Sequence, residues 1–179
     1  MFTRSVAFMG GLLLAASLAW ADSPGSFGFP VPAEPNQVFF LQRSMNANTV
    51  VYVANMKDNG RISGKRPLDV YWRRYGNTGE RQELNFAEQN LAYGVNAVLQ
   101  SKEPQSFRIT LKAYAKRSAV LRVVNNVPRL ETKLSGRDVQ LVSAYLHLDE
   151  SKRVPTVTRV DAWGKALDTG EWVFESFIP

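Results

Sequence analysis

From Val38 to the end of the chain, short apolar runs alternate with turn-forming residues. In the stretch FRITLKAY, every second residue from Phe107 to Ala113 is apolar. A period of two gives a strand one apolar and one polar face, as antiparallel sheets have. Runs of this kind predict an all-β fold of about nine antiparallel strands, a meander that closes as a barrel or folds as a sandwich. The strand candidates are VFFLQRS, TVVYVANM, LDVYWRRY, YGVNAVLQS, FRITLKAY, AVLRVVNN, RLETKL, DVQLVSAYLHL, TVTRVDAW and EWVFESFI.

One segment, ELNFAEQNLAYG, departs from this period, because its apolar residues recur at helical spacing. Asn85 can cap a helix, with Glu88 three residues later as its capping-box partner. Gly94 then ends the helical pattern. The sequence therefore predicts one short inserted helix near residues 86–91.

The first 21 residues have the features of an export signal. Arg4 supplies a positive charge, an apolar run follows, and Ala19 and Ala21 flank a small-x-small cleavage site. A lone transmembrane anchor is the alternative, but the run of about fourteen residues is shorter than the roughly 20 that span a bilayer. We expect cleavage after Ala21, then a flexible arm rich in Pro and Gly over 22–37, and a single β domain over 38–179.

The chain contains no cysteine, so it has no disulfide, no thiol nucleophile and no thiolate metal ligand. A cysteine-free exported domain of this size suits a bacterial periplasm, and we expect that localisation. The net charge of +6 is scattered along the chain. It is ordinary for an exported protein, and it also fits an anionic or sugar-containing envelope ligand. Nucleic acid is not an expected partner outside the cytoplasm.

The polar segment RSMNAN separates two apolar runs and predicts the turn of a hairpin. Asn46 and Asn48 tolerate left-handed backbone and bond to nearby main chain, so turn chemistry explains both. Arg43 alternates with Phe39 and Leu41, which places its guanidinium on the same strand face as two large apolar side chains. Two interpretations stay open for Arg43: a strand-end arginine that reaches solvent, or a partly buried donor aimed at a carboxylate or phosphate.

The run VYWRRY combines aromatic and basic residues on one strand. Alternation places Tyr71, Arg73 and Tyr75 on one face, and Trp72 and Arg74 on the other. Cross-strand packing of aromatic rings against arginines is the commoner outcome. The functional alternative is a stacking platform for a sugar or an anionic amphiphile, which Trp163 and Trp172 could complement from the C-terminal hairpin.

Three segments, FFLQRSMNANTVVYVAN, PLDVYWRRY and LAYGV, resemble the bacterial exported family known as domain of unknown function 4833. Its motifs are R-S-x-N-x-N-x-V-x-Y, P-x-x-V-Y-W and A-Y-G, and the resemblance weakens beyond about Ser101. The resemblance implies no activity. It implies that the matching polar residues gather around one hairpin and its neighbours. The ligand-binding candidates are Arg43, Ser44, Asn46, Asn48, Tyr52, Tyr71, Trp72 and Tyr93.

His147 is the only histidine, and alternation places it on one strand face with Val139, Leu141, Ser143 and Tyr145. We expect a structural role for it rather than that of a catalytic base. A catalytic zinc site usually takes two or three histidines, and no serine lies in a G-x-S-x-G elbow. The segment NMKDNG lacks the ligands of a calcium loop. The sequence therefore predicts no metal site, no catalytic residue and no cofactor.

Carboxylate pairs stay open, because sequence alone does not show which side chains meet. The candidates are Asp69, Glu83, Glu88, Asp161 and Glu175. The leading hypothesis is an exported, non-catalytic β-domain that binds a ligand or an envelope partner. One alternative is a hydrolase or lyase that uses carboxylates on an envelope substrate. The other is a small outer-membrane barrel, although most runs are shorter than the roughly 9–11 residues of a spanning strand.

Overall fold

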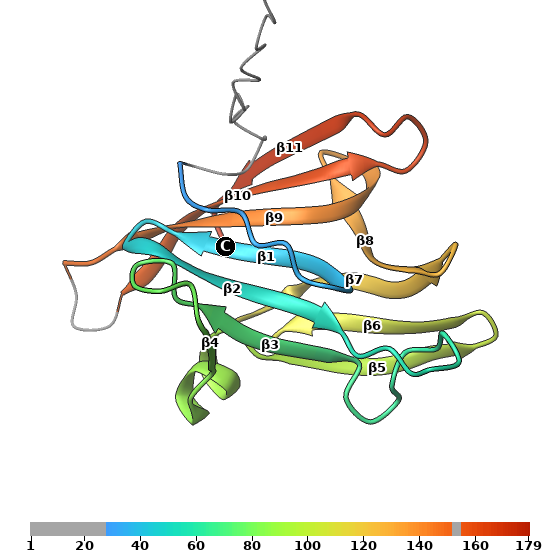
Figure 1. Cartoon of the computed structure of the whole chain (residues 1–179). Helices are drawn as coiled ribbons and strands as arrows, with labels where there is room; N and C mark the ends of the chain where they lie inside the picture. Colours follow the sequence, from blue (N-terminus) through green and yellow to red (C-terminus); the bar gives the residue numbers. More distant parts are fainter. Residues whose placement is uncertain (1–27, 152–154) are drawn as a thin grey trace, which may run out of the picture.

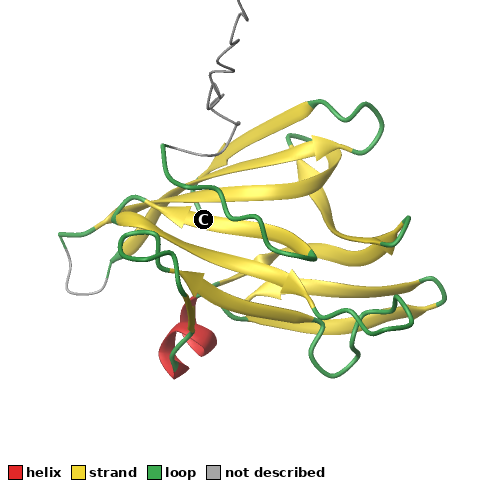
Figure 2. Cartoon of the chain, viewed as in Figure 1, coloured by secondary structure: helices red, strands yellow, loops and turns green. Residues whose placement is uncertain are grey.

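The computed structural model describes residues 28–151 and 155–179, so the predicted signal peptide lies outside the described residues. Nearly all the regular structure is β (Figures 1 and 2). The elements are β1 (Gln37–Arg43), β2 (Asn46–Ala54), β3 (Leu68–Arg73), β4 (Arg81–Glu83), the π-helix η1 (Glu88–Ala92), β5 (Val95–Lys102), β6 (Gln105–Leu111), β7 (Tyr114–Val124), β8 (Val127–Leu134), β9 (Arg137–Asp149), β10 (Thr156–Ala166) and β11 (Trp172–Phe177). The predicted all-β fold with one short inserted helix is confirmed. No helix among the described residues is long and apolar enough to cross a membrane.

The strands form one curled sheet in the order β4-β3-β2-β1-β9-β8-β7-β6-β5. Strand β9 pairs with β8 through Arg137–Gln140 and with β1 through Ser143–Leu146. Strand β10 pairs with β9 along most of the length of β9. A strand has two edges, so β8 and β1 follow one another along one edge of β9. Figure 1 shows the consequence: β9, β1, β2 and β3 form one wall, and β8, β7, β6 and β5 turn back to complete a half-barrel.

One pairing differs from the predicted antiparallel meander, because β1 and β9 run parallel. Phe40 lies opposite Ser143 in this ladder, more than a hundred residues away along the chain. The alternation of apolar residues along a strand shows which side chains share a face, and it carries no information on the direction of the neighbouring strand. The sheet is therefore mixed.

A bulge in β9 changes which of its residues share a face. The register with β10 shifts between the pairs Trp163–Ser143 and Gly164–Leu141, which leaves Val142 as an extra residue. Leu141 therefore faces the interior, whereas His147 lies on the outer face beside Asp161. The prediction that His147 shares a face with Val139 and Leu141 is wrong for this reason.

The capping box predicted for the inserted helix is present. The main-chain N–H of Asn85 donates to Glu88 Oε2 at 2.8 Å, and that of Glu88 donates to Asn85 Oδ1 at 2.9 Å. Gly94 is required where the helix ends, because a Cβ at this position would lie 1.8 Å from the Gln89 carbonyl oxygen. These contacts fix the path of the chain from η1 into β5, and with it the position of Tyr93.

The hydrophobic core lies on the concave side of the sheet. Its largest buried side chains include Trp72, Tyr52, Phe107 and Leu121. The convex side is covered near β1–β3 by residues of the arm before β1. There Gln42 Nε2 donates to the Pro30 carbonyl at 3.0 Å, and Arg73 pairs with Glu34.

Candidate functional site

The concave interior contains a cavity of about 600 Å³. Most of its lining is aliphatic or aromatic and comes from both walls of the half-barrel. As far as the chain is described, the only charged side chains in its lining are those of Arg43 and Arg117, and no side chain there is a carboxylate, histidine or lysine. Cavities of this size and composition are typical of sites that take small apolar molecules.

Arg43 lies at one end of this cavity. It shares the inward face of β1 with Phe39 and Leu41, as their alternation predicts, and all three residues line the cavity. One guanidinium nitrogen, Nη1, donates to the Tyr93 hydroxyl at 3.0 Å, and Cζ lies 4.7 Å from the centre of the Trp72 ring. The guanidinium is therefore held between an aromatic face and a phenol.

The donors of Arg43 are not all used. Its Nε is buried and has no hydrogen-bond partner. Among the described residues, no carboxylate forms an ion pair with Arg43. A buried N–H without a partner and a half-buried charge without a counter-ion both raise the free energy of the fold at this point. An acceptor entering the cavity would lower it.

Tyr93 is held in place from several sides. The Tyr52 hydroxyl donates to the Tyr93 carbonyl at 2.9 Å, and the Trp72 and Tyr93 rings meet edge to face with centroids 5.0 Å apart. Burial raises the pKa of the Tyr52 hydroxyl well above its usual range, so Tyr52 stays a protonated donor. The structure thus brings together four of the eight predicted ligand-binding residues, namely Arg43, Tyr52, Trp72 and Tyr93.

The other four predicted residues lie elsewhere. Tyr71 is on the outer face of β3, where the Cζ of Arg81 lies 3.9 Å from its ring centre and Glu34 is a close neighbour. Alternation along β3 therefore separates Tyr71 from Trp72 by the thickness of the sheet, as predicted for this strand. Trp163 is also on an outer face, next to Phe174 with ring centroids 4.7 Å apart, so it does not complement Trp72.

The polar residues of RSMNAN connect strands and loops. The Ser44 hydroxyl accepts a hydrogen bond from the Leu148 N–H at 3.0 Å, which extends the contact between β1 and β9. Asn46 Oδ1 accepts from the Asn48 N–H at 3.0 Å, in keeping with the predicted turn. Asn48 differs from the prediction, because its Oδ1 accepts from the Gly76 N–H and so fixes the loop after β3.

A comparison with protein families adds to this geometry. The model for Domain of unknown function (DUF4833) matches residues 39–176. The chain belongs to this family. No curated protein and no solved structure matches it. The match includes all four residues that meet at the Arg43 end of the cavity, and it confirms the resemblance noted from the sequence motifs.

The DUF4833 domain has a second arginine in the cavity that the sequence did not single out. Arg117 of β7 forms a bidentate ion pair with Glu175 of β11, and its Cζ lies 4.2 Å from the centre of the Phe177 ring. The hydrogen bonds from Arg117 lower the pKa of Glu175 below its usual value. The charge of Arg117 is thus balanced inside the chain, unlike that of Arg43. The sequence could not reveal this ion pair, because no local pattern connects two residues that are 58 positions apart.

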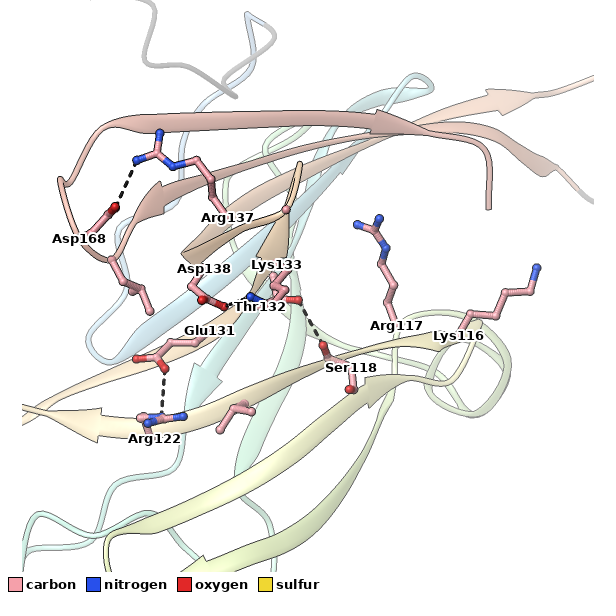
Figure 3. Close-up of a pocket in the computed structure, with 13 residues that line it drawn as sticks. Lys116, Arg117, Ser118, Arg122, Glu131, Thr132, Lys133, Arg137, Asp138 and Asp168 are labelled. Atoms are coloured by element: carbon pink, nitrogen blue, oxygen red, sulfur yellow. Dashed lines mark hydrogen bonds and ion pairs between the residues drawn. The ribbon is translucent and has the colours of Figure 1, made fainter.

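A larger hollow of about 1100 Å³ lies between β7, β8 and the turns that follow β8 and β10 (Figure 3). Three ion pairs in it are Arg122–Glu131, Lys133–Asp138 and Arg137–Asp168. Most of its positive charge is therefore compensated by neighbouring carboxylates. The hollow is a weaker candidate for anion binding than the Arg43 end of the interior cavity.

A buried carboxylate, that of Asp161, lies on the outer face of the DUF4833 domain. Its two oxygens accept from the Ser176 hydroxyl at 2.6 Å and contact His147 Nε2 at 2.6 Å, and Arg159 lies beside it. Burial raises the pKa of Asp161, but these bonds and charges outweigh burial and hold the pKa below its usual value. The carboxylate stands between the serine and the histidine, so His147 contacts Asp161 and not Ser176, and the lowered pKa of Asp161 makes this carboxylate a weak base toward the serine. This is a structural cluster.

Proposed function

We propose that this DUF4833 protein is an exported, non-catalytic domain that binds an amphiphile with a long apolar body and one anionic head group. The apolar body occupies the interior cavity, and the head group accepts hydrogen bonds from Arg43. The observation that carries this proposal is the guanidinium of Arg43, which faces an apolar cavity with a donor and a charge left unsatisfied.

The energetics favour an anionic head group. A partly buried guanidinium without a counter-ion is less stable than a paired one, because its charge has lost part of its hydration. A carboxylate or phosphate offers oxygen acceptors to a planar donor fork, and charge-assisted hydrogen bonds are stronger than neutral ones. The aliphatic lining contributes the remaining affinity through burial of the hydrocarbon body.

The composition of the cavity supports binding over catalysis. Proton transfer in a hydrolase or lyase needs a carboxylate, histidine or similar group within hydrogen-bond reach of the substrate. The described side chains that line the cavity include no carboxylate and no histidine. Export is supported by the signal-like features of residues 1–21, and release of the protein by osmotic shock tests it separately.

The test uses a long-chain carboxylate, palmitate, and the uncharged alcohol of the same chain length. Calorimetry should show that the purified protein binds palmitate more tightly than the alcohol. Arg43→Lys should weaken palmitate binding about tenfold or more, the equivalent of one charge-assisted hydrogen bond, because lysine lacks the planar fork. Its melting temperature should stay close to that of the wild type.

Arg74→Lys is the matched control. The Cζ of Arg74 also lies 4.7 Å from the centre of the Trp72 ring, but Arg74 does not line the cavity. This variant should bind palmitate as the wild type does. Absence of palmitate binding, or equal losses in the two variants, would overturn the proposal.

A further inference from the structure

Two large apolar side chains at η1 are exposed to solvent. Phe86, which starts the helical turn, is 85% exposed, and Leu91 is 75% exposed. Figure 2 shows that this turn projects from the body of the sheet. Exposing side chains of this size on a projecting turn is unfavourable in water unless another surface covers them.

The exposed turn adjoins the cavity described above. Leu91, Ala92 and Tyr93 all line that cavity, so Leu91 is both exposed and part of the lining. The same segment carries the phenol that bonds to Arg43. The turn therefore forms a rim of the cavity opening, and whatever covers it also faces the route by which a ligand enters.

Positive charge accompanies the exposed apolar side chains. Lys112 Nζ donates to Asn90 Oδ1 of η1 at 2.8 Å, and Arg74 Nε donates to Gln82 Oε1 at 2.5 Å. Neither cation forms an ion pair with a carboxylate within the described part of the chain. The carboxylate of η1, Glu88, is used in the capping box. The rim thus combines exposed apolar side chains with Lys112, a cation that has no carboxylate partner among the described residues.

We infer that η1 docks on the surface of a bilayer that contains anionic phospholipids, with Phe86 inserted between the head groups and Lys112 beside a phosphate. This inference rests on the proposed function, since docking would place the cavity opening against the membrane from which the amphiphile comes or to which it goes. A stable protein interface usually buries roughly 800 Å² per partner over a fairly flat patch. A single projecting turn suits shallow insertion into a membrane interface better.

Co-flotation with lipid vesicles tests the inference. The full protein should float with vesicles of phosphatidylcholine and phosphatidylglycerol in equal parts, and less with phosphatidylcholine alone. Phe86→Ser should reduce binding to the mixed vesicles about tenfold, because the inserted ring is lost. Lys112→Gln should reduce binding to the mixed vesicles and leave the weak binding to phosphatidylcholine unchanged.

Val127→Ser is the matched control for an exposed apolar side chain. Val127 is 52% exposed and follows β7, whose eleven residues place it roughly 30 Å from the turn at Lys112. This variant should float as the wild type does. Equal flotation of the Phe86→Ser and wild-type proteins, or no flotation of either, would overturn the docking of η1.

Palmitate binding in solution separates the two proposals. Phe86 and Lys112 do not line the cavity, so Phe86→Ser and Lys112→Gln should bind palmitate normally. Normal palmitate binding without flotation overturns the membrane contact alone. Flotation without palmitate binding overturns the proposed function and with it the role assigned to docking.

Discussion

Arg43 and Gly94 show how single residues set the shape of the cavity end. Arg43 faces inward because it alternates with Phe39 and Leu41, and it stays there because Trp72 and Tyr93 contact its guanidinium. The position of Tyr93 in turn depends on Gly94, where the main chain packs directly against the Gln89 carbonyl. A change at Gly94 therefore acts on the site through the backbone.

Gly94→Ala should destabilise the protein by about 2–3 kcal/mol, because the new Cβ would overlap a main-chain oxygen that cannot move without the whole turn. Urea denaturation measures the change. Gly64→Ala is the control, since a Cβ at Gly64 would meet nothing within 4 Å. Similar stability losses in the two variants would show that the close contact with the Gln89 carbonyl is not the cause of the loss.

At the scale of elements, the arm before β1 and the turn at η1 have opposite roles. The arm is attached to the convex face through Glu34, which accepts from Arg73 Nε at 2.5 Å and from Nη2 at 2.7 Å. The turn at η1 leaves its apolar side chains in solvent at the cavity opening. The arm therefore stabilises the fold, whereas the turn at η1 is available for contact with another surface.

The Glu34–Arg73 pair should make stability depend on pH. The hydrogen bonds from Arg73 lower the pKa of Glu34 below its usual value of 4.5, so the ionised carboxylate stabilises the fold. This contribution is complete above the unfolded-state pKa and is lost as the pH falls through the lowered pKa. Glu34→Gln should cost about 1–2 kcal/mol at neutral pH, and the difference from wild type should shrink in acid.

Urea denaturation at a series of pH values measures this effect. Asp138→Asn is the control, because Asp138 and its partner Lys133 are both largely exposed and such pairs contribute little. A Glu34→Gln variant whose deficit stayed constant into acid would show that Glu34 does not act through its charge.

At the scale of the whole molecule, the two walls of the half-barrel are joined by contacts between the loop after β2 and the start of β6. The main-chain N–H of Ile62 donates to Gln105 Oε1 at 2.9 Å, and Gln105 Nε2 donates to the Ile62 carbonyl at 3.1 Å. The side-chain amide of Gln105 thus makes the two hydrogen bonds with Ile62 that the main chain of a neighbouring strand would make. It joins the loop after β2 to the start of β6. Arg61 and Glu103 add an ion pair nearby.

Gln105→Leu should destabilise the fold by about 2–3 kcal/mol, because both main-chain groups of the buried Ile62 would lose their partner. Hydrogen exchange of the Ile62 amide should accelerate, and urea denaturation should give the change in stability. Glu103→Gln removes only the exposed ion pair and should have little effect. If the Ile62 amide stayed protected in Gln105→Leu, other contacts would hold the two walls of the half-barrel together.

Several features of this DUF4833 protein were determined by the sequence alone. Period-two runs predicted the strands, and the Asn85–Glu88 capping box predicted the inserted turn. Alternation placed Arg43 on the same strand face as Phe39 and Leu41, and Tyr71 on the face opposite to Trp72. Each of these features depends on residues within a few positions of one another. Local propensity, hydrogen-bonding groups and the two-residue period are sufficient to specify them.

Other features were decided only by the tertiary structure. They are the parallel pairing of β1 with β9, the bulge at Val142, the bond from Gly76 to Asn48, and the balance of Arg117 by Glu175. Their partners lie between 20 and 103 residues apart, and many alternative pairings satisfy the same local pattern. The choice among them depends on how the whole sheet curls and buries its apolar face. That is why Arg117 has a counter-ion in the folded chain while Arg43 faces the cavity without one.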